Sequence, residues 1–194
     1  MRGTDYRAFV MAVDRVEKRL RRVTAALDEA GIKYAVIGGN AVAAWVSRVD
    51  PGATRSTKDV DLLVDQSDID RIESVLGEAG FTREDVLGVT LFKEPDEPSV
   101  RASIHLVWAQ QKVRPEYALP APALDESERD PQGFYVIDLP ALVRMKLTSF
   151  RRIDQVHIED LLKLNMIDAA VRAGLPTELE RRLVEVEGSI DDSI

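Results

Sequence analysis

The stretch YAVIGGNAVAAWVSRVDPGATRSTKDVDL, residues 34–62, sets the architecture of the chain. Its first four residues are a short apolar run that favours a strand, Gly38-Gly39 breaks that run, and helical character resumes over residues 40–46. Residues 49–57 are typical of a loop, and residues 59–64 alternate as a strand does. The pattern therefore predicts a strand, a glycine turn, a helix, a loop and a second strand, in that order.

Two carboxylates, Asp59 and Asp61, stand two positions apart on the second strand. Because successive side chains of a strand point to opposite faces, both carboxylates lie on one face, with Cα atoms about 6.6 Å apart. Two anions at that separation repel by about 2.5 kcal/mol at an effective dielectric constant near 20, and a divalent cation between them removes this cost. Oxygen ligands suit Mg²⁺ or Mn²⁺, so the pair is a candidate metal site. The alternative is a pair of solvent-facing aspartates on an edge strand.

Gly38-Gly39 lies directly between the first strand and the helix. Glycines at this place let phosphate oxygens approach the backbone N–H groups at the positive end of the helix. A tight turn that requires positive φ explains the same dipeptide without any phosphate. A phosphate loop and a carboxylate pair within one short unit form a more specific pattern than either feature alone.

The composition of the 194 residues limits the classes of protein that the chain can be. An apolar fraction of 45% and a charged fraction of 31% predict a folded chain, one domain with a helical appendage. No apolar run approaches the ~18 residues that a membrane span needs, and the N-terminal residues lack the layout of a secretion signal. We therefore expect a cytoplasmic protein without a membrane partner.

The sequence contains no cysteine, which excludes disulfides and thiolate metal sites. Carboxylates and the two histidines, His105 and His157, are left as metal ligands. A net charge of −8 argues against nucleic-acid binding over the whole surface, because that affinity comes from Lys and Arg. A local basic patch between residues 15 and 22 is possible, but we interpret these residues, interleaved with Asp14 and Glu17, as a solvated helix face.

The rest of the chain predicts further helices and a hairpin. The expected helices cover residues 5–29, a segment that Ser67 or Asp68 caps and that runs to Gly80, residues 139–150 and 154–173, and a last helix that begins at Pro176 before a frayed acidic tail at 191–192. Two apolar runs, 86–93 and 102–108, are expected to form a hairpin around the acidic turn 94–98. Residues 115–133 carry prolines and little periodicity, which predicts a long surface crossing where the sheet ends.

These elements divide the chain into two parts. We expect residues 1–135 to form a sheet-bearing core with an N-terminal helix, and residues 136–194 to form a helical part packed on that core. The expected fold class is α/β, of the α+β type with a mixed sheet.

Motifs in both parts resemble a known superfamily. The run Ile37-Gly38-Gly39-Asn40-Ala41-Val42, followed by Arg55-x-Thr57-x-Asp59-Val60-Asp61-Leu62, resembles the nucleotidyltransferase superfamily, close to its AbiEii/AbiGii toxin-like branch. Segments 142–147, 151–154 and 157–162 look like that branch's helical motifs, with a lysine and a later aspartate. The resemblance covers residues 33–165 and is strongest in the first two motifs.

The resemblance implies a nucleotidyltransferase-like core, with an N-terminal helix and a C-terminal helical extension. Such a protein transfers a nucleoside monophosphate from a nucleoside triphosphate (NTP) to an acceptor, with Mg²⁺. By this resemblance Gly38 and Gly39 hold the triphosphate, Thr57 takes part in nucleotide binding, and Asp59 and Asp61 bind the metal ions.

The resemblance also implies nucleotide contacts for Lys146 and Asp160. Lys146 would reach a phosphate, or it is an ordinary lysine that snorkels from an amphipathic helix. Asp160 matches the last acidic motif, or it belongs to a surface charge cluster with Glu159 and Asp154. Arg55 and Lys58, in the loop before the carboxylate pair, either steer the triphosphate or line an exposed loop.

The sequence departs from the superfamily pattern at His105, where many members carry a third metal-binding carboxylate. A neutral imidazole supplies no negative charge and suits Mn²⁺ better than Mg²⁺. Alternatively His105 is the general base that accepts the proton of the acceptor hydroxyl, or a hydrogen-bonded residue of the sheet without a catalytic part. We interpret His157, beside Glu159 and Asp160, as a surface residue.

Three hypotheses of function follow. The leading one is an active nucleotidyltransferase, toxin-like, with a tRNA or a protein as acceptor. The second is a degenerate member that binds a nucleotide or a partner protein without chemistry, which the replaced carboxylate allows. The third is an interaction module that pairs through its terminal helices with a cognate antitoxin or with itself. The acceptor and the base preference do not follow from the residues, because variable loops and appended helices build acceptor pockets.

Overall fold

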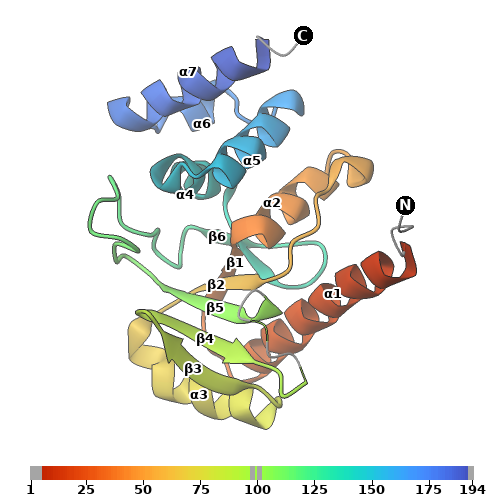
Figure 1. The fold of residues 1–194 in the computed structure, drawn as a ribbon. Coiled ribbons are helices and arrows are strands. Elements are labelled where there is room, and N and C mark those ends of the chain that lie inside the picture. The colour runs from red at the N-terminus through yellow and green to blue at the C-terminus, as the bar shows by residue number, and fades with distance from the viewer. Residues whose placement is uncertain (1–5, 97–98, 100–101, 192–194) are drawn as a thin grey trace.

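The computed structural model describes residues 6–96, 99 and 102–191. Within these residues one mixed sheet has seven strands in the order β3-β4-β5-β2-β1-β7-β6 (Figure 1). The strands are β1 (Tyr34–Ile37), β2 (Val60–Val64), β3 (Thr82–Val86), β4 (Val89–Lys93), β5 (Ile104–Trp108), β6 (Ser127–Arg129) and β7 (Tyr135–Ile137). The helices are α1 (Tyr6–Glu29), α2 (Gly38–Ser47), α3 (Ile69–Glu78), α4 (Leu139–Ser149), α5 (Arg152–Lys163), α6 (Ala169–Ala173) and α7 (Thr177–Asp191), with 3-10 turns at Pro51–Ala53 and Gln66–Asp68. The expected α/β class with a mixed sheet is confirmed.

Helices cover both faces of the sheet. Figure 1 shows α1 and α3 together on one side, while α2 lies on the other side beneath α4 and α5. Strands covered on both faces bury every side chain, so they consist of nearly continuous apolar residues. β1 is buried at each of its four positions, and in β2 only Asp61 is partly exposed. One polar residue therefore interrupts an otherwise apolar centre of the sheet.

The pairing of the central strands determines which residues lie beside Asp61. β2 runs antiparallel to β1 and parallel to β5, in a register that sets Asp61 opposite Ile37 on one side and opposite His105 on the other. β7 pairs parallel to β1 on the far side. The order of strand, helix, loop and strand expected for residues 34–64 is confirmed, but α2 already begins at Gly38, so the two glycines are its first residues, and β2 begins at Val60, one residue after the expected start. α1 agrees with the expected first helix over its described residues.

The edges of the sheet differ from the prediction. Within the 86–93 run, residues 89–93 form β4, which is antiparallel to β5 as expected. Val86 belongs instead to β3, and Leu87 and Gly88, which both have positive φ, connect β3 and β4 in a tight hairpin. β3, with the sequence TREDV, is an exposed edge strand whose polar residues conceal it in the sequence. The expected turn at residues 94–98 lies partly outside the described residues.

The sheet does not end in the 115–133 crossing, so that prediction is wrong. β6 and β7 form a hairpin beyond it and extend the sheet to Ile137. Each has three residues, too few to show an alternating pattern. The division of the chain at residue 135 remains a proposal, since β7 begins at that position and belongs to the sheet.

Three helix boundaries also need correction. Asp68, one of the two expected residues, takes the N-cap position of α3, but its side chain makes no capping hydrogen bond. Asp65 caps the preceding 3-10 turn, since its side chain accepts a hydrogen bond from the backbone N–H of Ser67 at 2.9 Å. The expected helix 154–173 is two helices, interrupted at Asn165, where φ is +55°, a conformation that asparagine tolerates. Pro176 directly precedes α7, which extends to Asp191; residue 192 lies outside the described residues. No helix in the described part of the chain is long and apolar enough to span a bilayer.

Candidate metal and nucleotide site

Asp59, Asp61 and His105 converge at one place on the sheet. The Nδ1 atom of His105 lies 3.2 Å from Oδ1 of Asp61 and 3.9 Å from Oδ2 of Asp59. One candidate ligand atom from each of the three residues falls within 4.8 Å of the others. The predicted geometry of two carboxylates on one face is confirmed, and the parallel pairing of β2 with β5 brings the histidine to the same place.

The glycine turn lies directly against this cluster. Gly38 has a φ of +67°, and a Cβ atom built on it would lie 2.0 Å from Oδ2 of Asp61. A Cβ on Gly39 would lie 3.1 Å from Cβ of Thr57. Gly38 is therefore required twice, for its backbone conformation and for the space that the Asp61 carboxylate occupies. The predicted convergence of the acids with the turn is confirmed.

Hydrogen bonds fix the position of Asp59, which precedes β2. The hydroxyl of Thr57 donates to Oδ1 of Asp59 at 2.5 Å, and the side-chain amide of Asn40 donates to the backbone oxygen of Asp59 at 2.7 Å. The contact of Asn40 was not predicted, although its position after the two glycines places it in the first turn of α2. Together these bonds hold the loop that carries Asp59 against the start of the helix.

The three side chains fit a divalent cation. Their exposed fractions are 35% for Asp59, 26% for Asp61 and 21% for His105, so each is accessible from solvent. Two carboxylates and one imidazole provide two negative charges and a nitrogen donor, a set that suits Mn²⁺ better than Mg²⁺. Asp61 and His105 also touch one another, which orients the ring.

Lys146 and Asp154 form a buried ion pair between α4 and α5. Their charged atoms are 3.0 Å apart, and the exposed fractions of the side chains are 6% and 0%. Lys146 therefore does not snorkel to the surface, and the alternative that expected a snorkelling lysine is wrong. Burial acts to raise the pKa of Asp154, but the hydrogen bond from Arg151 and the charge of Lys146 outweigh it and lower this pKa to about 2. Asp154 is ionised at neutral pH.

Asp160 binds Arg55 in the loop that leads to Asp59. Nε and Nη2 of Arg55 donate to the two carboxylate oxygens of Asp160 at 2.5 and 3.0 Å. This fork-like pair ties the loop to α5. The expected surface cluster of Asp160 with Glu159 and Asp154 is wrong, because Asp154 is fully buried. Lys58 is exposed, as the loop interpretation expected.

His157 is buried, so its interpretation as a surface residue is wrong. Its exposed fraction is 7%, and Nδ1 has no hydrogen-bond partner among the described residues. Burial, reinforced by the positive charge of Lys146, lowers the pKa of His157 to about 4. At neutral pH the ring is neutral and packs in the helical part. The charged residues beside it in the sequence, Glu159 and Asp160, gave no sign of this burial. Only the helical periodicity of α5 separates the buried face, which carries His157, from the more exposed face.

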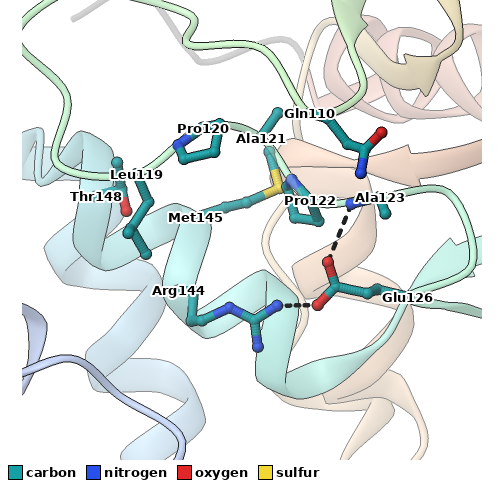
Figure 2. A pocket seen from close by; sticks show the side chains of 10 residues that line it. All are labelled: Gln110, Leu119, Pro120, Ala121, Pro122, Ala123, Glu126, Arg144, Met145 and Thr148. Carbon is teal, nitrogen blue, oxygen red and sulfur yellow. Dashed lines mark hydrogen bonds and ion pairs between the residues drawn. The ribbon is translucent and has the colours of Figure 1, made fainter.

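A separate cavity of about 460 Å³ lies between α4 and the proline-rich segment 119–126 (Figure 2). Its wall is largely apolar, with Leu119 and Met145 among the side chains drawn. Arg144 and Glu126 form an ion pair at its border. None of its lining residues belongs to the metal cluster, and sequence analysis did not anticipate this cavity.

Comparisons with known proteins give one family match and several similar solved structures. Residues 4–139 match the model of a family described as uncharacterised nucleotidyltransferase. Among solved structures, an antigenic nucleotidyltransferase-like protein from Paracoccidioides brasiliensis is similar at 20% identity and a TM-score of 0.60, over 93% of this chain and 91% of that one. ANT(2")-Ia in complex with adenylyl-2"-tobramycin is similar at 18% identity and a TM-score of 0.52, over 89% and 97%.

At such identities the likeness to the two solved structures shows the fold alone. The comparison with curated proteins gives no match. The family model, in contrast, covers well over half of the chain and includes the glycine turn, both aspartates and His105. The protein therefore belongs to the family of uncharacterised nucleotidyltransferases.

Proposed function

We propose that this protein transfers a nucleoside monophosphate from an NTP to an acceptor hydroxyl, with a divalent cation held by Asp59, Asp61 and His105. The observation that carries the proposal is the convergence of these three side chains, with ligand atoms within 4.8 Å of one another, beside the Gly38-Gly39 turn. Carboxylates at the start of a helix repel an NTP unless a cation joins them. The two features together therefore support a site for a cation and a polyphosphate.

Each residue has a defined part in the proposed reaction. Asp59 and Asp61 hold the cation, and backbone N–H groups at the start of α2 bind the phosphates. Thr57 orients Asp59 through the 2.5 Å hydrogen bond. When bound, the cation offsets charge on the attacking and leaving oxygens of an in-line displacement at the α-phosphorus. The products are an acceptor with a new phosphodiester bond, pyrophosphate, and the proton of the acceptor hydroxyl, which leaves to solvent.

For His105 we propose the role of third ligand. Its Nδ1 atom lies 3.2 Å from Asp61 and 3.9 Å from Asp59, so this nitrogen is placed to share a cation with both carboxylates. The nitrogen donor supports Mn²⁺ as the preferred ion and Mg²⁺ as the weaker one. For Lys146 and Asp160 we propose structural parts, because each has a carboxylate or a guanidinium partner within 3.0 Å.

The finer assignment to the AbiEii/AbiGii toxin-like branch also belongs to the proposal. It is supported by the motifs of residues 37–62 and of the helices α4 and α5. On this assignment the acceptor is a tRNA or a protein, and a cognate antitoxin or a second copy of the chain is the partner. Incubation with a radiolabelled NTP, total tRNA and total cell protein tests it, because label in neither fraction excludes both acceptor classes.

Substitution of the aspartates tests the reaction. Asp59→Asn and Asp61→Asn keep size and fold but remove the charges, so both variants are expected to lose nucleotide transfer and pyrophosphate release. Asp70→Asn, an exposed aspartate of α3, is the matched control and should keep full activity. Transfer that persists at wild-type level in both site variants would end the proposal.

A second candidate function is nucleotide binding without transfer. One observation favours it, since the cluster holds only two negative charges, with His105 at the position where the superfamily resemblance leads us to expect a carboxylate. In that case calorimetry shows NTP binding in the presence of Mn²⁺, while pyrophosphate is not released with any acceptor. Release of pyrophosphate dependent on Asp59 excludes it.

A further inference from the structure

Asp154 organises a small charged cluster at the junction of α4 and α5. Its oxygens accept hydrogen bonds from Nζ of Lys146 at 3.0 Å, from the hydroxyl of Ser149 at 2.8 Å and from Nε of Arg151 at 2.7 Å. Nη2 of Arg151 donates to the second oxygen at 3.3 Å. The carboxylate has an exposed fraction of 0%, so this geometry is enclosed by protein.

The cluster carries an excess of positive charge. One ionised carboxylate stands against two cations, and Lys146 is as buried as its partner. The side chain of Arg151, in contrast, has an exposed fraction of 60%. Of the two cations, Arg151 is the one that solvent reaches, so the net positive charge of the three side chains is accessible there.

Arg151 stands at the N-terminal end of α5, in the part of the fold that packs beside the helix of the glycine turn. It directly precedes α5, which packs against α2, the helix that begins at Gly38 (Figure 1). Further along α5, Asp160 binds the loop that leads to Asp59. The hydrogen bond to Asp154 raises the pKa of Arg151 against the effect of burial, and the charge of Asp61 adds to the rise. The charge of the metal-site carboxylate therefore acts on the Arg151 guanidinium.

We infer that Arg151 binds the triphosphate of the NTP and the departing pyrophosphate, the part that the motif resemblance assigned to Lys146. This inference rests on the proposed function. A guanidinium carries five N–H donors in a rigid fork that fits phosphate oxygens. Nε and Nη2 hold Asp154, which fixes the plane of the fork, and Nη1 is the nitrogen that meets the anion. Lys146, at 6% exposure, pairs with Oδ1 of Asp154 inside the protein.

Calorimetric titration with inorganic tripolyphosphate in Mn²⁺ buffer tests the inference on the whole chain. Arg151→Gln is expected to weaken binding about tenfold or more, as the loss of a charge-assisted hydrogen bond does. Arg151→Lys, which keeps the positive charge, should lose less affinity for tripolyphosphate than Arg151→Gln does. Arg152→Gln is the matched control, because Arg152 is the adjacent exposed arginine and donates to Gln155; it should bind as the wild type does. Circular dichroism and thermal unfolding identify any variant that fails to fold.

The outcomes separate the two proposals. Wild-type binding by folded Arg151→Gln overturns the inference and leaves the proposed function standing. Failure of the wild-type protein to bind tripolyphosphate overturns both. In transfer assays the inference predicts that Arg151→Gln raises the KM for the NTP and that Arg151→Lys raises this KM less. An unchanged KM in Arg151→Gln contradicts the inference. If Lys146 contacts the phosphates instead, Lys146→Met weakens binding in a folded protein while Arg151→Gln does not.

Discussion

At the scale of single residues, the contact between Gly38 and Asp61 links the phosphate turn to the metal cluster. An added Cβ meets Oδ2 of Asp61 at 2.0 Å, so the carboxylate fills the space that any other residue would need. The glycine meets two requirements: it adopts the positive φ at the start of α2, and it leaves room for the carboxylate of Asp61 on β2. The position of the Asp61 carboxylate therefore depends on Gly38 directly.

Gly38→Ala is expected to displace the Asp61 side chain and to abolish Mn²⁺ binding. Gly31→Ala is the matched control, because Gly31 has a similar φ of +64° and an added Cβ has nothing within 4 Å. The control should lose about 1–2 kcal/mol of the free energy of unfolding, the cost of positive φ alone, and keep its metal. Denaturant unfolding and Mn²⁺ titration measure the two effects, and equal metal affinity in both variants would disprove the contact.

His105→Asp introduces a carboxylate at the position where the superfamily resemblance leads us to expect one, so it should change the metal that the site prefers. We expect the wild-type protein to transfer nucleotide better with Mn²⁺ than with Mg²⁺, and His105→Asp to raise the activity with Mg²⁺. His105→Ala should lose activity with both ions. Activity assays at matched ion concentrations measure this, and full activity of the alanine variant would mean that His105 is only a hydrogen-bonded residue of the sheet.

The predictable residues share one property, which is local spacing. Asp59 and Asp61 are two apart on a strand, and Gly38-Gly39 separates a strand from a helix, so the sequence alone sets their orientation. His105 was found through a resemblance, and its contact with Asp61 depends on strand pairing across 44 positions. The burial of His157 and the partners of Lys146 depend on how α4 and α5 pack, which no local pattern encodes.

At the scale of elements, the pairing of Arg55 with Asp160 connects the helical part to the site. The bond spans 105 positions of the sequence and reaches the loop four residues before Asp59. Since 54% of the Arg55 side chain is exposed, solvent screens the pair, and its contribution to stability is about 1 kcal/mol or less. Its importance lies in the position of the loop rather than in the stability of the fold.

Asp160→Asn and Arg55→Gln are therefore expected to lower nucleotide transfer by similar factors with little loss of stability. The double variant should be no worse than either single variant, because both remove one interaction. Kinetic assays of the wild-type protein, the two single variants and the double variant measure the coupling free energy between Arg55 and Asp160. Additive losses would mean that Asp160 contacts the nucleotide by itself, as the motif resemblance implied.

The elements were predicted well where their residues are apolar and periodic. β1, α2, β2 and α4 follow from short apolar runs with clear breaks at glycine, proline or aspartate. β3 was missed because an exposed edge strand carries polar residues, and the gap between α5 and α6 was missed because leucine and methionine continue the apolar pattern through it.

At the scale of the whole molecule, one hydrophobic core joins the sheet to the C-terminal helices. Val36 and Leu62 of the sheet belong to the same buried cluster as Leu147 of α4 and Ile158 of α5. The polar network around Asp154 and His157 lies within this joint region. The two parts inferred from the sequence are therefore expected to unfold together, and the protonation of His157 should affect the whole molecule.

The stability of the protein is expected to fall in weak acid because of His157. Its pKa is about 4 in the folded protein and close to 6.5 when unfolded. The unfolded chain thus binds more protons between these values, so stability is fully present above pH 6.5 and is lost as the pH falls toward 4. His157→Gln should reduce the difference in unfolding free energy between pH 7 and pH 4.5, by up to about 1.4 kcal/mol per pKa unit. Urea unfolding at both pH values measures it, and an unchanged difference would mean that the ring is not buried in its neutral form.

The central claim is that Asp59, Asp61 and His105 share one cation beside the glycine turn. A crystal soaked with Mn²⁺ and a non-hydrolysable NTP analogue tests it through the anomalous signal of manganese. We predict a peak about 2.0–2.3 Å from an oxygen of each aspartate and from a nitrogen of His105, with the phosphates over the start of α2. A manganese ion bound elsewhere, with these three side chains free of it, would contradict the claim.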